Sequence, residues 1–104
     1  QAFERRRDLI VSLAKEIPGL EVNKPEGAFY LFPKCSSFFG KTDGQRTINN
    51  STDFAMYLLE VGHVATVGGD AFGDPDCFRM SYATSDDNIK EAMSRIKNAL
   101  SLLK

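Results

Sequence analysis

The sequence predicts a single α/β domain over residues 1–104, a two-layer sandwich with helices packed on a small mixed or antiparallel sheet. Three observations lead to this prediction. A chain of 104 residues is enough for one compact domain and too short for two. Its composition, 42% hydrophobic and 26% charged, is that of an ordinary globular protein. Hydrophobic patterns then follow the order helix, strand, strand, helix, strand, strand, helix.

The first half of the chain contains one helix, two strands and a long loop. Apolar residues recur at helical spacing over 3–17, and Pro18 ends this helix. Short strands are predicted over 20–22 and 28–32. The second strand is apolar on both faces, which favours a strand covered on both sides. Residues 34–51 are polar and show no period, so we expect a long loop, either functional or mobile.

The second half contains two further helices. One is predicted over 52–61, with Gly62 as its stop, and a strand over 64–67 follows. The last helix has the clearest pattern. Ser85 is a good N-cap residue, and apolar residues at helical spacing continue from there to Leu103.

The connection over 68–76 has the glycine spacing of a phosphate-binding loop but not its chemistry. Aspartate and proline stand where such a loop needs lysine and serine or threonine, and three aspartates would repel phosphate. The ligand order of a calcium loop is also missing. We therefore expect a flexible turn whose glycines permit unusual backbone angles.

Charge and residue content exclude several classes of protein. The net charge of −1 argues against a nucleic-acid partner, and the apolar runs are far shorter than the roughly 20 residues of a membrane span. Cys35 and Cys77 could form one disulfide, but two reduced thiols in a cytoplasmic protein are favoured. His63 is the only histidine, and it completes no catalytic or metal-binding set. We expect it to have a capping or partly buried structural role.

The strand predicted over 77–83 contains the candidate binding residue. Phe78, Met80 and Tyr82 alternate onto one face, and the other face carries Arg79 among small side chains. Small neighbours would leave room for a carboxylate to bind the guanidinium group in bidentate fashion. An arginine on the solvent face of a one-sided sheet gives the same pattern, so the residues alone leave both interpretations open.

Four segments also match, in order, the motifs of a known family. Residues 3–8 end in Arg-Arg-Asp, residues 24–33 contain Pro-Glu-Gly-Ala-Phe-Tyr, residues 64–73 end in Val-Gly-Gly-Asp-Ala-Phe-Gly, and residues 78–83 contain Arg-Met-Ser-Tyr-Ala. Together they resemble the C-terminal small domain of the fold-type I, class I/II pyridoxal-phosphate aminotransferases, of the aspartate aminotransferase kind. Gly68 departs from the family, which usually has proline there, so we expect a more flexible loop beside the substrate pocket.

The resemblance implies an enzyme that transfers an amino group from an amino acid to a 2-oxo acid, with Arg79 binding the α-carboxylate of the substrate. It also implies that pyridoxal 5'-phosphate and the lysine that binds it belong to a large domain of the same polypeptide, before Gln1. This segment then supplies no catalytic, cofactor-binding or metal-binding residue and is expected to be inactive alone. The full-length enzyme is expected to be a cytoplasmic homodimer.

The first helix favours the same interpretation. No capping residue precedes Phe3, so we expect the helix to begin before Gln1, in a longer polypeptide. The alternative is a free-standing regulatory or small-ligand-binding module that uses Arg79 for an anionic effector without catalysis. The amino-acid specificity of an enzyme cannot be read from these residues.

Overall fold

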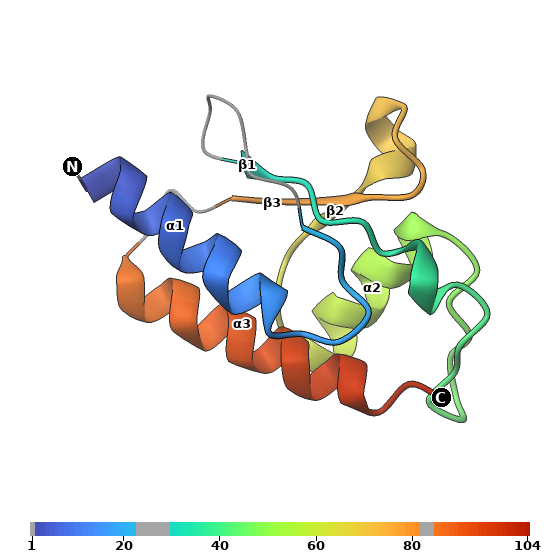
Figure 1. Ribbon diagram of the computed structural model, residues 1–104. Coiled ribbons are helices and arrows are strands. Elements are labelled where there is room, and N and C mark those ends of the chain that lie inside the picture. The colour runs from blue at the N-terminus through green and yellow to red at the C-terminus, as the bar shows by residue number, and fades with distance from the viewer. Residues whose placement is uncertain (1, 23–29, 82–84) are drawn as a thin grey trace.

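The computed structural model describes residues 2–22, 30–81 and 85–104, and it forms two layers. One layer is an antiparallel sheet of three strands in the order β1–β3–β2, and three α-helices lie on one side of it (Figure 1). The strands are β1 (Tyr30–Leu31), β2 (Val67–Gly68) and β3 (Phe78–Ser81). This arrangement confirms the predicted two-layer α/β fold, with the sheet antiparallel.

The helical layer consists of α1 (Ala2–Lys15), α2 (Ser51–Gly62) and α3 (Asp86–Ser101). Helix α3 packs against both of the others, with α1 running beside it along one flank (Figure 1). Its first turn is capped as predicted, because the Ser85 side chain accepts a hydrogen bond from the Asn88 amide at 3.2 Å. No helix among the described residues is long and apolar enough to cross a membrane.

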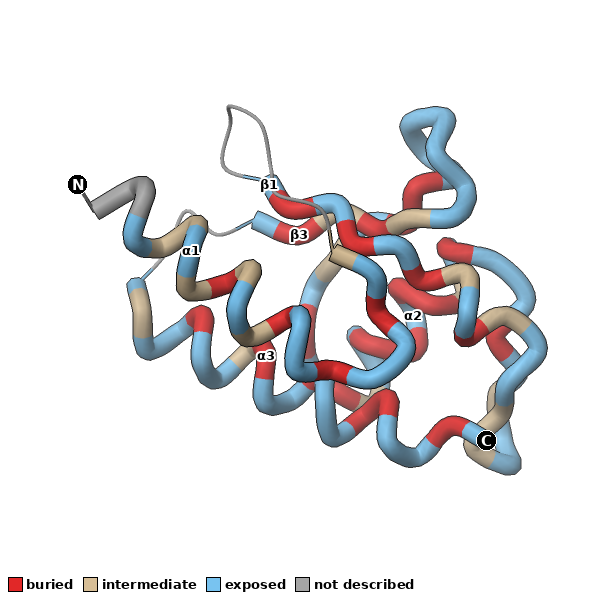
Figure 2. The backbone as a smooth tube through the Cα atoms, viewed as in Figure 1, coloured by how far each residue is buried: buried red, intermediate tan, exposed pale blue. Residues whose placement is uncertain are grey.

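The hydrophobic core lies between the two layers, where buried residues of the helices face the sheet (Figure 2). Phe78 and Met80 of β3 point into it, as the alternation predicts, while Tyr82 lies outside the described residues. Tyr57 of α2 is buried, and its hydroxyl donates a hydrogen bond to the carbonyl oxygen of Ala99 in α3 at 2.5 Å. The three α-helices thus pack against the inner face of the sheet and do not cover its other face.

Two predicted strands are shorter over the residues that the structure describes. The strand expected over 20–22 is reduced to one bridge, in which Glu21 and Lys34 exchange backbone hydrogen bonds of 3.3 and 2.8 Å. Of the strand expected over 28–32, the described part is assigned only at β1. The length of a strand depends on how many of its residues can form hydrogen bonds with a neighbouring strand. The hydrophobic pattern of the strand itself does not show this.

The end of α2 also differs from the prediction. Gly62 does not stop the helix but remains inside it, buried against α3. His63 is the residue in left-handed conformation, with φ 57° and ψ 38°, and the following strand begins at Val67 instead of residue 64. The expected capping role of His63 is therefore confirmed through its backbone, while its side chain is exposed.

The loop over 34–51 is confirmed as largely irregular but is firmly tied to the rest of the fold. It contains a short 3₁₀ helix, η1 (Ser36–Phe38), and Ile48 is buried in the core. Thr42 and Lys104 exchange backbone hydrogen bonds of 3.2 and 2.9 Å, which join this loop to the C-terminal residue.

Candidate functional site

The side of the sheet that faces away from the helices carries exposed aromatic side chains. Tyr30, Phe32 and Phe72 have exposed fractions of 39%, 43% and 37%. Phe72 belongs to a second 3₁₀ helix, η2 (Gly69–Phe72), and Figure 1 shows this segment rising from the sheet away from α1 and α3. The prediction that strand 28–32 is covered on both sides is wrong for its described residues, because the three α-helices lie on the other side of the sheet.

Arg79 lies among these rings. It is half-buried on β3, and its guanidinium carbon is 4.5 Å from the centroid of the Tyr30 ring and 5.6 Å from that of Phe72. The Phe72 ring in turn meets Phe32 edge to face, with centroids 5.6 Å apart. A guanidinium group is weakly hydrated and is attracted to aromatic rings, so these contacts stabilise it at the surface without supplying a negative charge of their own.

Arg79 differs from the other arginines in its ionic contacts. Within the described parts of the chain, every other arginine forms an ion pair with a carboxylate: Arg5 and Arg6 with Asp86, Arg7 with Asp8, Arg46 with Asp43 and Glu60, and Arg95 with Glu91. Arg79 has aromatic contacts but no such pair with a described residue. Among the described residues, Arg79 is therefore the arginine that could pair with a carboxylate supplied from outside.

Sequence reasoning placed this arginine correctly but missed its surroundings. Cys77, just before β3, and Ser81, at its end, flank Arg79 as predicted, and Ala83 lies outside the described residues. The open space expected beside these small side chains is partly filled by Tyr30 and Phe72, which come from other segments. The aromatic residues on both faces of strand 28–32 were the available signal for this cluster.

The glycine-rich connection over 68–76 is more regular than predicted. Instead of a flexible turn it contains η2, closed by a hydrogen bond from the Asp74 amide to the Gly69 carbonyl at 2.9 Å. The Gly69 amide donates to the Cys77 carbonyl at 2.8 Å, which fastens the segment to β3. Of the glycines in this connection, Gly73 alone has a positive φ, 83°.

Gly68 serves close packing and not flexibility. It is buried, and a Cβ atom added to it would lie 2.7 Å from the Ser51 carbonyl oxygen and 2.8 Å from the Thr52 nitrogen. Its φ of −65° suits proline, the residue usual in the family. The structure thus gives Gly68 a packing role that its sequence context did not suggest, since the glycine allows β2 to approach the first turn of α2.

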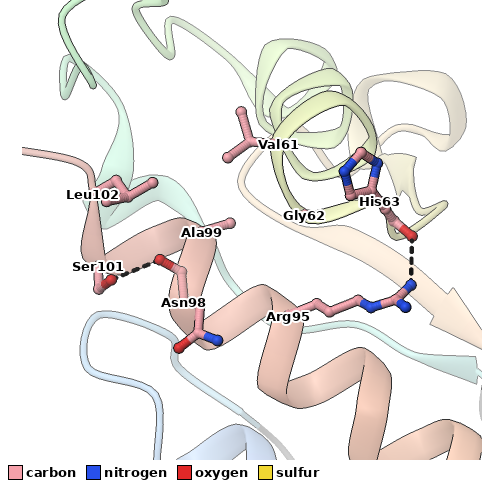
Figure 3. Close-up of a pocket in the computed structure, with 8 residues that line it drawn as sticks. All are labelled: Val61, Gly62, His63, Arg95, Asn98, Ala99, Ser101 and Leu102. Carbon is pink, nitrogen blue, oxygen red and sulfur yellow. Dashed lines mark hydrogen bonds between the residues drawn. The ribbon is translucent and has the colours of Figure 1, made fainter.

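His63 belongs to a different region, a groove of about 440 Å³ between the C-terminal ends of α2 and α3 (Figure 3). Arg95 lies beside it and donates a hydrogen bond to the His63 carbonyl oxygen at 3.5 Å, and it also pairs with Glu91. These contacts hold the two helix ends together. Among the described residues, no group of three or more His, Cys, Asp or Glu side chains could hold a metal ion.

Both cysteines are free thiols, in agreement with the reduced state favoured by the sequence. Burial, followed by the nearby Cys77, raises the pKa of Cys35 to about 12. Burial also raises the pKa of Cys77 to about 11, with a further contribution from the carboxylate of Asp74. Because the thiolate is the reactive form, neither residue has the environment of a nucleophile.

Comparison with known families decides the identity of the fold. The family described as "Aminotransferase class I and II" matches residues 1–96, nearly the whole chain. The chain belongs to the class I and II aminotransferases. It is 51% identical over 102 residues to the "Probable aspartate/prephenate aminotransferase" of Rickettsia prowazekii, and 50% identical over 100 residues to the "Aspartate aminotransferase" of Rhizobium meliloti. These alignments cover 97% and 95% of this chain.

Solved aminotransferase structures have the same fold. The crystal structure of the Rhizobium meliloti aspartate aminotransferase superposes on 99% of the chain, with a TM-score of 0.95 and 49% identity. The alanine aminotransferase of Pyrococcus furiosus covers 95% of the chain with a TM-score of 0.81 and 32% identity. The chain spans about a quarter of these proteins, 26% and 24% of their structures, and 26% and 24% of the two curated relatives.

The described residues do not fit a site for the phosphate-bearing cofactor that the family implies. Phosphate binding needs converging cations or a free helix N-terminus. Lys34 pairs with Glu21 at 4.0 Å, and Lys41 lies over the Phe38 ring. The N-terminus of α2 already binds the carboxylate of Asp70. None of these three described groups is therefore free to hold a phosphate.

Proposed function

We propose that this chain is the small-domain part of a pyridoxal-phosphate-dependent aminotransferase, in which Arg79 binds the α-carboxylate of the amino-acid substrate. Arg79 is the observation that carries the proposal, because it is the arginine whose charge no described carboxylate balances. Membership of the class I and II aminotransferases supports the reaction type. A free-standing binding module would also use Arg79 to bind an anion, but this alternative does not explain why residues 1–96 match the aminotransferase family.

The chemical role of Arg79 follows from its geometry. A guanidinium group presents parallel N–H donors that match the two oxygens of a carboxylate. Held between Tyr30 and Phe72, the arginine has less freedom to lose when a substrate binds, which favours a fixed orientation of the amino acid. Pyridoxal phosphate, when bound, supplies the electron sink for amino transfer, and this chain orients the substrate toward it.

The rest of the proposal concerns the longer protein. Since the chain spans about a quarter of its relatives, the cofactor, the lysine that binds it and the phosphate contacts are assigned to the remaining polypeptide. A homodimer in the cytoplasm is part of this proposal. Aspartate is the first substrate to test, because relatives at 51% and 50% identity carry it in their names.

The experiment is a kinetic comparison of arginine variants in the full-length enzyme. Arg79→Ala removes the carboxylate partner and should lower kcat/KM for aspartate by about 100-fold or more, mainly through KM. Arg95→Ala is the matched control, since it removes an exposed arginine far from the outer sheet face, and it should leave KM within about twofold. An unchanged KM in Arg79→Ala would refute the assignment.

A further inference from the structure

The segment that places Phe72 beside Arg79 is anchored to the first turn of α2. Asp70 precedes Phe72 by two residues, and its carboxylate accepts hydrogen bonds from the Thr52 amide at 3.3 Å and the Thr52 hydroxyl at 3.0 Å. The Asp70 amide in turn donates to the buried hydroxyl of Ser51 at 3.0 Å. Three hydrogen bonds thus join η2 to the first turn of the preceding helix, between residues that are 18 or 19 positions apart.

These contacts complete the cap of α2. Asn50 is its N-cap residue and accepts from the Asp53 amide at 2.8 Å, which leaves the Thr52 amide without a partner inside the helix. The Asp70 carboxylate, which lies outside the helix, accepts the hydrogen bond of the Thr52 amide. A carboxylate is favoured there over an amide, because the N-terminal end of a helix carries a partial positive charge and charged hydrogen bonds are stronger than neutral ones.

The anchor determines where Phe72 lies. On one side, Gly69 donates a hydrogen bond to the carbonyl oxygen of Cys77, the residue before β3, and on the other, Asp70 is bound to α2. With both points held, the Phe72 ring can rest against the Arg79 guanidinium, 5.6 Å from its central carbon. Without the second point, the ring is free to move away from the arginine.

The geometry points to Asp70 as a positioning residue: through Thr52 and η2 it holds Phe72 against Arg79 and so orients the guanidinium group for the substrate carboxylate. This inference rests on the proposed carboxylate-binding role of Arg79. Asp70 acts through Thr52 and Phe72 and not by contact with the substrate. Its effect on the reaction is therefore indirect and passes through substrate binding.

The test uses the full-length enzyme and paired variants. Asp70→Asn keeps the shape of the side chain but removes its charge, and Thr52→Val removes the hydroxyl donor from the other end of the contact. Both should raise KM for aspartate by about threefold to tenfold with kcat within about twofold. Asp76→Asn, the same change at an exposed aspartate of the same connection, and Thr52→Ser, which keeps the donor, should leave KM within about twofold.

A double-variant comparison separates positioning from general stability. In an Arg79→Lys background the planar group that stacks on Phe72 is gone, so adding Asp70→Asn should change KM by less than about twofold. Full additivity of the two changes, or an Asp70→Asn variant that matches the Asp76→Asn control, would overturn the inference. If Arg79→Ala alone leaves KM unchanged, the proposed function fails, whereas an effect of Arg79→Ala without one of Asp70→Asn refutes only the positioning role.

Discussion

The guanidinium carbon of Arg79 lies 4.5 Å from the centre of the Tyr30 ring, and the register of the sheet explains this contact. Tyr30 pairs with Ser81, which is two residues from Arg79 on the same face of β3. Tyr30 and Arg79 are therefore diagonal neighbours across two strands, within reach of an aromatic ring and a long side chain. The pairing of β1 with β3 fixes the position of the Tyr30 ring beside Arg79. The position of the Phe72 ring depends instead on the hydrogen bonds between Asp70 and Thr52.

Tyr30 should matter through its ring and not through its hydroxyl group. A cation–π contact of this kind contributes about 0.5–2 kcal/mol, so Tyr30→Leu should raise KM for the amino-acid substrate by about threefold to tenfold. Tyr30→Phe keeps the ring and should stay within about twofold of the parent enzyme. Steady-state kinetics of the two variants checks this, and equal effects of both would contradict a role for the ring.

Gly68 should not tolerate a side chain. An added Cβ atom meets backbone atoms of Ser51 and Thr52, which cannot rotate away, so Gly68→Ala should destabilise the fold by about 1–3 kcal/mol. Gly68→Pro should be no better, although its φ is suitable, because the ring carries the same atom. Urea unfolding of the full-length protein measures the loss. The control is Gly62→Ala, where the new methyl group has only ordinary contacts at 3.4 Å and alanine favours the helix.

Local patterns in the sequence predicted those parts of the fold that depend on local chemistry. The Ser85 cap, the stripe of α3 and the alternation of β3 follow from side chains and their spacing, and the structure confirms each. Arg79 on the outer face of β3 was predictable for the same reason. The contacts between distant segments were not, since Tyr30, Phe72 and Arg79 meet only after the strands have paired.

Two interpretations of glycine missed the same physical factor, close packing. Gly62 and Gly68 were interpreted through backbone freedom, a stop in one case and a flexible loop in the other. In the structure both have negative φ and lie against neighbouring elements, Gly62 on α3 and Gly68 on the first turn of α2. A sequence shows that a glycine lacks a side chain, but only the packed fold shows whether conformation or space requires it.

His63 carries a local conformational cost that glycine would remove. It is the non-glycine residue with positive φ among those described, and the left-handed region costs an L-residue roughly 1 kcal/mol. Because its side chain is exposed and Arg95 binds its carbonyl oxygen, His63→Gly should keep the contacts and stabilise the end of α2 by about 0.5–1 kcal/mol. Slower hydrogen exchange of α2 amides would show this. His63→Ala should give no such protection, and faster exchange in His63→Gly would contradict the expectation.

Cys77 should react with alkylating reagents only at unusually high pH. Its pKa is raised to about 11 by burial and then by the Asp74 carboxylate, so the native protein holds the thiol proton more tightly than an unfolded chain. The alkylation rate should still rise about tenfold from pH 9 to pH 10, where an ordinary cysteine levels off. Because the Cys77 pKa is higher in the folded protein than in the unfolded chain, the protonated thiol stabilises the fold below about pH 9, and this stabilisation is lost as the pH rises toward 11.

Residue-resolved mass spectrometry measures the alkylation rate of Cys77. Asp74→Asn should lower the pH at which this rate levels off, while buried Cys35 stays unlabelled. A rate for Cys77 that levels off near pH 9 in the parent protein would show that its environment does not oppose the thiolate.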